Sequence, residues 1–317
     1  MHPITTLTLN PSIDSASEAQ EVRPIHKVRT RNERFDPGGG GINVSRVVRE
    51  LGGDTLAVYM AGGATGPVFD SLIETRKVPR LRVNIQGHTR ISQTIFETSS
   101  GREFRFVPEG PLVDAAECER LLEALGDVDF QWLVASGSLP RGAPADFYTK
   151  VANVARARGA RCVVDSSGDA LKQAIAGGGL HFVKPSLGEF ESLVGRKLAD
   201  NASQERAAAE IVASGKVVMI CLTLGHEGAL LVDADGPFRM PALPVEAKSA
   251  VGAGDSFVAA MTLALSRGLA TREAFLHGVA AGTAAVLTPG TELCKREDVE
   301  RLLGEARVIA SKHSAAA

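Results

Sequence analysis

The sequence predicts an α/β fold in which a mostly parallel β-sheet is covered by helices on both faces. Short apolar runs with strand character alternate along the chain with stretches of helical periodicity. The apolar runs are nearly continuous rather than alternating, which is typical of strands that are buried on both faces of a parallel sheet. Glycines or polar turns close most of these runs, as expected where a strand gives way to a helix.

The predicted elements follow one another in chain order. Strands are expected at residues 5–9, 55–60, 132–136, 161–165, 181–184 and 217–224, and helices at 43–51, 147–158 and 256–267. Ligands of such sheets bind beyond the carboxyl ends of the strands. Polar residues that fall at or near those ends are Asp14, Ser138, Asp165, Lys184 and Thr223.

One region departs from this rhythm and predicts a small β-sheet. Residues 89–98 and 102–107 alternate in polarity across Ser99-Ser100-Gly101, which indicates a β-hairpin, and residues 15–36 lack helical periodicity. We interpret both inserts as a lid that also joins two copies of the chain into a homodimer. An antiparallel extension of the main sheet is the alternative. The predicted division assigns residues 1–14, 37–87 and 108–317 to the main α/β domain, and 15–36 and 88–107 to the lid.

Composition and charge narrow the classes of function. The chain of 317 residues is 44% hydrophobic and 23% charged, which is typical of a soluble globular protein. A net charge of −2 and 5% aromatic residues give no reason to expect a nucleic-acid or membrane partner. The four cysteines form no Cys-x-x-Cys pair, so neither disulfides nor zinc are expected. No basic leader precedes an apolar core, and we expect a cytoplasmic protein.

The second of two glycine clusters, Val251-Gly252-Ala253-Gly254-Asp255-Ser256, precedes an apolar helical stretch. Glycines let main-chain N–H groups approach a ligand because no Cβ intervenes. A helix start adds unpaired N–H donors and roughly half an elementary positive charge, which suits a phosphate that gains negative charge. Asp255 is placed to accept a proton from an attacking hydroxyl group. On its own, the pattern fits a helix-capping aspartate equally well.

The first cluster, Gly38-Gly39-Gly40-Gly41-Ile42-Asn43, likewise brings bare backbone to a place where a hydroxyl-rich ligand can approach. The two clusters together suggest a kinase for a small hydroxyl compound. The chain contains no Gly-x-x-x-x-Gly-Lys-Ser/Thr motif and no Gly-x-Gly-x-x-Gly after a strand. A Walker-type ATPase and a Rossmann dehydrogenase are therefore disfavoured.

Seven segments resemble the PfkB family of ribokinase-like sugar kinases and occur in the family's order over nearly the whole chain. They are Thr6–Asp14, Pro37–Val44, Gly62–Gly66, Arg105–Val107, Ser136–Pro140, Val164–Gly168 and Val251–Ser256. The resemblance implies a three-layer αβα domain of the ribokinase type with a small β-sheet lid. It also implies ATP-dependent phosphorylation of a sugar phosphate with Mg²⁺ as cofactor.

The resemblance also implies roles for single residues. Asp255 would be the catalytic base, and the amides of Gly252, Ala253 and Gly254 would stabilise the transferring phosphoryl group. Arginine side chains match phosphate oxygens bidentately, which suits the lid arginines. The residues expected at the sugar phosphate are Asp14, Arg29, Gly38, Gly39, Gly40, Gly41, Asn43, Arg90, Arg105 and Ser138.

On the nucleotide side, Glu189 would act through Mg²⁺, directly or through water. The residues expected at ATP are Lys27, Lys184, Ser186, Thr223, Gly225, Gly228 and Thr283. The resemblance leaves open whether Lys27 comes from the same chain or from a partner subunit. The chain departs from the family here, since it has Ser186-Leu187-Gly188-Glu189 where the family normally has Asn-x-x-Glu. A shorter serine side chain predicts weaker binding of ATP or Mg²⁺.

Gly40 bears on the acceptor, because relatives that act on fructose 1-phosphate or tagatose 6-phosphate often have lysine there. The tetraglycine resembles the 6-phosphofructokinase subgroup and favours transfer to the 1-hydroxyl of fructose 6-phosphate, giving fructose 1,6-bisphosphate. Tagatose 6-phosphate, fructose 1-phosphate or a nucleoside are alternative acceptors, and a non-catalytic sugar-phosphate sensor is a further alternative. A monovalent cation is conceivable near Asp255 and the segment 288–291.

Overall fold

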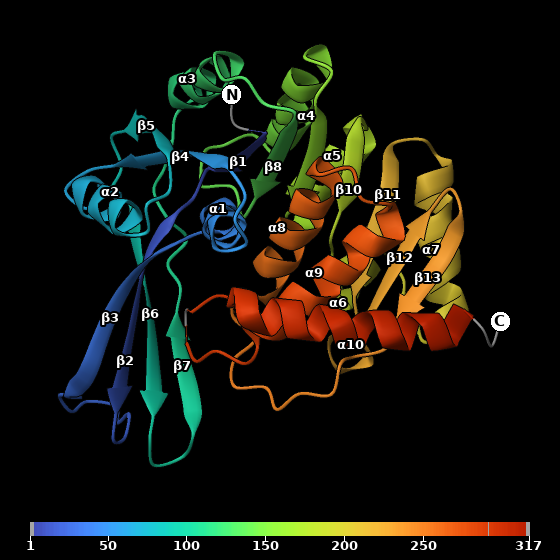
Figure 1. The fold of residues 1–317 in the computed structure, drawn as a ribbon. Coiled ribbons are helices and arrows are strands. Elements are labelled where there is room, and N and C mark those ends of the chain that lie inside the picture. Colours follow the sequence, from blue (N-terminus) through green and yellow to red (C-terminus); the bar gives the residue numbers. More distant parts are fainter. Residues whose placement is uncertain (1–2, 291, 315–317) are drawn as a thin grey trace.

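The computed structural model describes residues 3–290 and 292–314, and Figure 1 shows how they are arranged. Thr291, which belongs to the segment considered for a monovalent cation, lies outside the described residues. Two sheets form within them, one of nine strands and one of four. The larger sheet is the centre of the molecule, and the smaller sheet projects from it (Figure 1).

The large sheet has the strand order β13-β12-β11-β10-β9-β8-β1-β4-β5. Neighbouring strands from β5 to β11 are parallel, whereas β12 and β13 pair antiparallel at one edge. A mostly parallel sheet is therefore confirmed, although the sequence analysis did not place β5, β12 or β13. The strands are β1 (Ile4–Thr8), β4 (Thr55–Gly62), β5 (Arg80–Ile85), β8 (Trp132–Ser136), β9 (Arg161–Asp165), β10 (Leu180–Val183), β11 (Val217–Thr223), β12 (Ala229–Asp233) and β13 (Gly236–Met240).

Helices cover both faces of this sheet and complete three layers (Figure 1). On one face α1, α8, α9 and α10 share a hydrophobic core with Ile4 and Trp132, and on the other α3 to α7 share a second core with Leu7 and Val58. Phe69 joins α2 to β4. The helices are α1 (Gly40–Glu50), α2 (Gly66–Thr75), α3 (Ala115–Gly126), α4 (Phe147–Ala157), α5 (Gly168–Gly177), α6 (Leu187–Val194), α7 (Asn201–Ala213), α8 (Ala253–Ser266), α9 (Thr271–Ala285) and α10 (Arg296–Ser314), with a 3₁₀ turn η1 (Gly225–Glu227).

The small sheet has the order β3-β2-β6-β7 and is separate from the large sheet, so the alternative of an edge extension is wrong. Its strands are β2 (Ser12–Ala19), β3 (Thr30–Gly38), β6 (Arg90–Glu97) and β7 (Arg102–Phe106). β2 pairs with β6 in parallel, and the two outer pairings are antiparallel. β2 and β3 reach Ser12 and Gly38, beyond the segment 15–36 predicted for the lid. The division into two domains stays a prediction.

Both glycine clusters lie partly inside helices, which differs from the sequence expectation for the first. α1 begins at Gly40 rather than at residue 43, with Gly39 as its N-cap at a φ of 112°. α8 begins at Ala253, with Gly252 as its N-cap at a φ of 72°. A positive φ favours glycine at each cap. The first-turn N–H groups of both helices have no acceptor within their helix and are available to a ligand.

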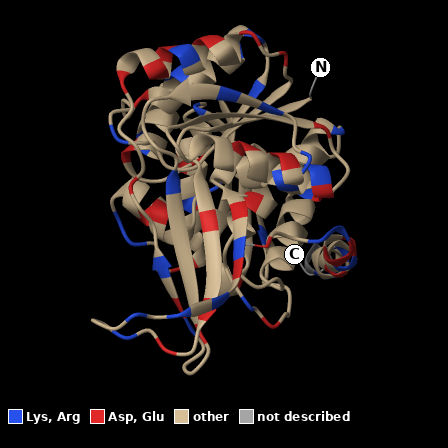
Figure 2. Ribbon diagram, turned by 90° about the vertical axis from the view of Figure 1, so that its left-hand side faces the viewer, with Lys and Arg blue, Asp and Glu red and all other residues tan. Residues whose placement is uncertain are grey.

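Charge is mixed over the described surface. In the view of Figure 2 basic and acidic segments are interspersed, and neither sign covers a whole face. The helices that the structure describes include none with the length and apolar character needed to cross a membrane. Among all residues that the structure describes, no cluster of three or more His, Cys, Asp or Glu side chains is arranged to hold a metal ion.

Candidate active site

Asp255 lies in the first turn of α8. Its Oδ2 accepts a hydrogen bond of 2.9 Å from Asn43 Nδ2, in the first turn of α1. Asn43 and Asp255, which are 212 residues apart, thereby join the two glycine clusters. A carboxylate next to free helix amides can take up a proton close to the place where an anion is stabilised.

Two further charged groups lie beside Asp255. Lys184 follows β10, and its Nζ is 3.4 Å from Oδ1 of Asp165, the last residue of β9. The lysine side chain is 7% exposed. A Cβ placed on Gly254 would lie 3.0 Å from Lys184 Nζ, so the ammonium group rests against the start of α8. Parallel strand ends and a helix N-terminus thus collect one cation and two carboxylates.

Burial and the neighbouring Asp165 raise the pKa of Asp255 to about 6, against the opposing effects of the Asn43 hydrogen bond and of Lys184. Burial also raises the pKa of Asp165, which Lys184 partly offsets. Burial disfavours the ammonium form of Lys184, but the carboxylates of Asp165, Glu189 and Asp255 outweigh it and raise the lysine pKa. Such a raised carboxyl pKa suits a base that works near neutral pH.

The tetraglycine packs against strand ends of the large sheet so closely that side chains do not fit. A Cβ on Gly40 would lie 2.1 Å from Ser136 Oγ, and one on Gly41 would lie 2.6 Å from the carbonyl oxygen of Leu7. A Cβ on Gly38 would lie 2.0 Å from Asp14 Oδ2. Packing against the protein itself therefore requires glycine here, in addition to any approach of a sugar.

Asp14 and Arg90 lie at the base of the small sheet, where it meets the large one. Asp14 Oδ1 accepts a 2.5 Å hydrogen bond from Ser12 Oγ. Burial raises the pKa of Asp14, while the charges of Arg46 and Arg90 act in the opposite direction. Arg90 donates to the carbonyl oxygens of Pro108 and Asn10, at 2.8 and 2.9 Å. Its Nε is buried and has no hydrogen-bond partner among the described residues.

The remaining residues expected at the sugar phosphate, taken together with Lys27 from the expected ATP residues, divide into two groups. Ser138 lies near the end of the small sheet that meets the large sheet, since its Oγ accepts a 3.3 Å hydrogen bond from Asn10 Nδ2. Lys27 and Arg29 are exposed in the loop between β2 and β3, at the end of the small sheet that is distant from the large sheet (Figure 1). Arg105 is exposed within β7. Within one chain, the loop that carries Lys27 and Arg29 therefore lies away from α8 (Figure 1).

On the expected nucleotide side, Ser186 is the N-cap of α6 and forms a capping box with Glu189. Ser186 N and Oγ both donate to Glu189 Oε2, each at 2.8 Å. The backbone of Ser186 also bridges to Thr223, at the carboxyl end of β11. The serine that departs from the family pattern therefore still orients Glu189, because a hydroxyl can cap a helix as an amide does.

Gly225 and Gly228 form the turn that follows β11. They have φ values of 60° and 105°, and a Cβ on Gly228 would lie 2.1 Å from the carbonyl oxygen of Met240. Thr283 is half-buried on α9, which packs against α8. Apart from Lys27, the expected nucleotide residues thus lie at or after the carboxyl ends of β10 and β11, at the start of α6 and on α9.

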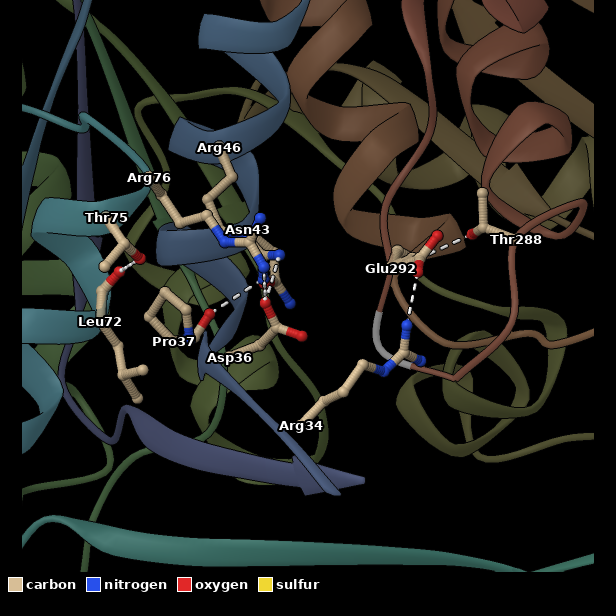
Figure 3. A network of polar contacts seen from close by, with 10 residues as sticks. All are labelled: Arg34, Asp36, Pro37, Asn43, Arg46, Leu72, Thr75, Arg76, Thr288 and Glu292. Carbon is tan, nitrogen blue, oxygen red and sulfur yellow. Dashed lines mark hydrogen bonds and ion pairs between the residues drawn. The ribbon is translucent and has the colours of Figure 1, made fainter. Parts of the chain in front are cut away.

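Two hollows flank the small sheet. One of about 670 Å³ lies between the small sheet and the main body, and its lining includes Lys248, Pro289 and Gly290. Arg34 of β3 lines it and forms an ion pair with Glu292 across the gap, at 2.5 Å (Figure 3). A larger hollow of about 840 Å³ is lined by Arg34, Asp36 and Arg46, among others. Neither hollow has Asp255 or a glycine of either cluster in its lining.

Two residues near Asp255 were not among the expected site residues. Asp165 was noted only as a strand-end residue, and its position at the end of β9 was the available signal. Arg46 donates to Asn43 Oδ1 at 3.1 Å, and no feature of the sequence analysis indicated it. Its position one helical turn after Asn43 is the signal that could have found it.

Comparison with known proteins identifies relatives of this chain. The family model described as pfkB family carbohydrate kinase matches residues 7–298. The chain is 41% identical to the ATP-dependent 6-phosphofructokinase isozyme 2 of Escherichia coli, over 94% of this chain and 97% of that protein. It is 40% identical to the protein of that name from Mycobacterium tuberculosis, over 94% of this chain and 88% of that protein.

Solved structures of Escherichia coli phosphofructokinase-2 share the fold. Its potassium complex matches with a TM-score of 0.93 at 40% identity, and its fructose-6-phosphate complex with 0.91 at 39%. Each comparison covers 97% of this chain and 100% of the other. That protein also has a tetrameric inhibited form, which matches with a TM-score of 0.91. The family model, the sequence identity and the shared fold together show that this chain belongs to the pfkB family of carbohydrate kinases.

Proposed function

We propose that the protein transfers the γ-phosphoryl group of ATP to the 1-hydroxyl of fructose 6-phosphate, producing fructose 1,6-bisphosphate in the cytoplasm. The observation that carries the proposal is Asp255, whose carboxyl has a raised pKa and lies in the amide-rich first turn of α8. The relatives that are named 6-phosphofructokinases support this acceptor, since they share 40–41% of the residues over almost the full chain.

The acceptor sugar would lie between the tetraglycine and Asp14, with its 1-hydroxyl toward Asp255. Asp14 and Asn43 supply an acceptor and a donor for sugar hydroxyls, and the glycine backbone permits close approach. The close contact of Gly40 with Ser136 favours an acceptor that needs no lysine at this position. Arg90, with a buried and unpartnered Nε, would supply positive charge near the 6-phosphate.

In the reaction, Asp255 accepts the proton of the 1-hydroxyl while the sugar oxygen attacks the γ-phosphorus and the bond to the leaving ADP oxygen breaks. The amides of Gly252, Ala253 and Gly254 donate to the phosphoryl oxygens, and the ammonium group of Lys184 lies beside the same helix start. Catalysis then rests on positioning and on fixed positive charge at the place where negative charge develops.

The carboxylates of Asp165 and Glu189 fit Mg²⁺, which is bound in kinases by one or two carboxylates together with substrate phosphates. Both lie close enough to Lys184 to raise its pKa, and Ser186 occupies one Glu189 oxygen. When bound, Mg²⁺ would neutralise part of the phosphate charge. A monovalent cation beside residues 288–290 would fit the potassium complex of the Escherichia coli relative.

The small sheet would act as a lid and as the contact between two subunits. Half-exposed apolar residues on its strands, among them Phe35, Ile91 and Phe106, support an interface. Association through this sheet would also bring Lys27, Arg29 or Arg105 of a partner toward the site. The tetrameric inhibited form of the Escherichia coli relative supports association between copies of this chain.

A substrate panel tests the proposed reaction. We expect kcat/KM for fructose 6-phosphate to exceed that for tagatose 6-phosphate, fructose 1-phosphate and free fructose by at least about tenfold, because each alternative loses a hydroxyl or phosphate contact. ADP release with ATP and Mg²⁺ measures it. A preference for fructose 1-phosphate or tagatose 6-phosphate would reassign the acceptor. Thermal stabilisation by sugar phosphate without any turnover would indicate the sensor.

The pH dependence of the reaction follows from Asp255. The base must be ionised, so we expect kcat/KM to fall roughly tenfold for each pH unit below its pKa of about 6. Burial, Asp165 and Asp14 raise this pKa, while Asn43 and Lys184 lower it. Initial rates under kcat/KM conditions, in buffers of constant ionic strength, measure the profile. An acid limb near the ordinary aspartate value of 3.8 would contradict the assignment.

A further inference from the structure

A series of hydrogen bonds connects Asp255 to the small sheet through α1. Asn43 Nδ2 donates to Asp255 Oδ2 at 2.9 Å, and Asn43 Oδ1 accepts from Arg46 Nη1 at 3.1 Å. Both ends of the Asn43 amide are therefore engaged, one by the carboxylate and the other by the guanidinium group. Figure 3 shows Asn43 and Arg46 pointing toward one another from neighbouring turns of α1.

Arg46 is itself held by the small sheet. Its Nη1 donates to the carbonyl oxygen of Pro37 at 3.0 Å, and its Nη2 donates to Asp36 Oδ1 at 3.2 Å. The side chains of Arg46 and Asp36 are only 10% and 4% exposed. Arg76, at the C-cap of α2, donates to the same Asp36 oxygen (Figure 3). Three donor contacts from one planar guanidinium group fix its orientation, and burial makes each contact stronger than it would be in water.

The orientation of Arg46 decides the orientation of the Asn43 amide. If the amide turned over, its NH₂ group would face the guanidinium donors and its carbonyl oxygen would face the Asp255 carboxylate. Both contacts would then be repulsive, because guanidinium has no acceptor and an ionised carboxylate has no donor. Arg46 thus selects the amide orientation in which an N–H holds Asp255.

We propose that Arg46 is a positioning residue for the reaction: it orients the Asn43 amide, which in turn holds the Asp255 carboxylate toward the acceptor hydroxyl. Asp36 and the Pro37 carbonyl keep Arg46 in place. This role rests on the proposed function of Asp255 as the base. It also means that the junction of β3 with α1 takes part in setting the geometry of the base.

Arg46→Met and Arg46→Lys test the role in the ATP-dependent assay. We expect Arg46→Met to lower kcat by roughly 10²-fold, the size of effect expected when a catalytic group is displaced by about 1 Å, while KM for ATP stays within about twofold. The acid limb of kcat/KM should move to higher pH, because a cation and an enforced hydrogen bond that favour ionised Asp255 are lost. The charged groups around Asp255 are otherwise unchanged, namely Asp14, Asp165 and Lys184.

A double-mutant cycle separates positioning from a structural role. Asn43→Ala removes the group through which Arg46 acts, so Arg46→Met should cause little further loss of kcat in that background. If the kcat losses of Asn43→Ala and Arg46→Met multiplied in the double variant, the proposal would be overturned. Arg82→Met is the matched control, since Arg82 forms a partly buried ion pair with Asp70 on β5 and α2, away from Asp255. It should leave kcat and the pH profile unchanged.

Arg46→Lys keeps the charge beside Asp36 and serves if Arg46→Met does not fold. It should lose kcat with a smaller shift of the acid limb, because lysine lacks the planar fork. Wild-type turnover together with unchanged kcat and pH profiles in both variants would overturn the positioning role alone. A wild-type protein without turnover would overturn the proposed function and the positioning role with it.

Discussion

Asp255→Asn is expected to lower kcat/KM for fructose 6-phosphate by about 10²- to 10⁴-fold, with little change in the binding of either substrate. Asparagine keeps the size of the side chain and an oxygen that can accept from Asn43 Nδ2, but it cannot take up the hydroxyl proton. The helix amides remain, so residual catalysis by charge stabilisation should persist. Steady-state kinetics with both substrates varied measure the effect.

The stability of the same variant distinguishes lost chemistry from lost folding. The folded-state pKa of Asp255 is raised to about 6, so at neutral pH the folded protein carries a carboxylate that burial disfavours. A neutral asparagine removes that cost, and Asp255→Asn should be at least as stable to urea as the wild type at pH 7. Near-normal turnover, or a loss of activity explained by unfolding, would refute the role of Asp255 as the base.

Lys184→Met is expected to lower the free energy of unfolding by about 3–5 kcal/mol and to lower activity severely. Breaking a buried ion pair by removing one partner has this cost, because the other charge stays buried. Here two carboxyls, those of Asp165 and Asp255, lose the cation that favours their ionised forms. Urea unfolding of the ligand-free, metal-free protein measures the stability, and ATP binding measures the functional part.

The pH dependence of that deficit identifies its cause. Asp165 and Asp255 have folded-state pKa values above their ordinary range, so they favour the folded state at low pH and lose that contribution as pH rises. Removing Lys184 raises both pKa values further. The deficit of the variant should therefore shrink as pH falls below about 6. Lys150→Met, at a surface pair that is 48% exposed on the lysine side, should change stability by no more than about 0.5 kcal/mol. A stability deficit of Lys184→Met that is independent of pH would point to lost packing instead of lost charge.

Much of the fold was predictable because its signals are local. Apolar runs with buried-strand character placed β1, β4, β8, β9 and β11 to within a few residues, and the hairpin turn placed β6 and β7. The helix start at Gly252-Ala253-Gly254 was confirmed, with Asp255 in its first turn. The start of α1 was predicted three residues late, because glycines are poor helix formers and their place in a first turn depends on the packing around them.

The candidate site was predictable only in part, because sequence signals are local and contacts between distant residues are not. Strand ends and glycine clusters mark residues that can face a ligand, and these marks are carried by neighbours in the chain. Which side chains meet is decided by the order of strands in the sheet. Asn43 reaches Asp255 across 212 residues, and Lys184 meets Asp165 because β9 and β10 are adjacent and parallel.

By itself, then, the sequence determined the α/β class, the small additional sheet, the family resemblance and the place of Asp255 at the start of a helix. Those properties follow from periodicity, turn chemistry and short motifs. The tertiary structure alone decided that Asn43 holds Asp255, that Arg46 and Asp36 stand behind Asn43, and that Lys27 and Arg29 lie far from the site within one chain. The contacts of Asn43, Arg46 and Asp36 depend on hydrogen bonds between residues that only the packing of β3, α1 and α8 brings together.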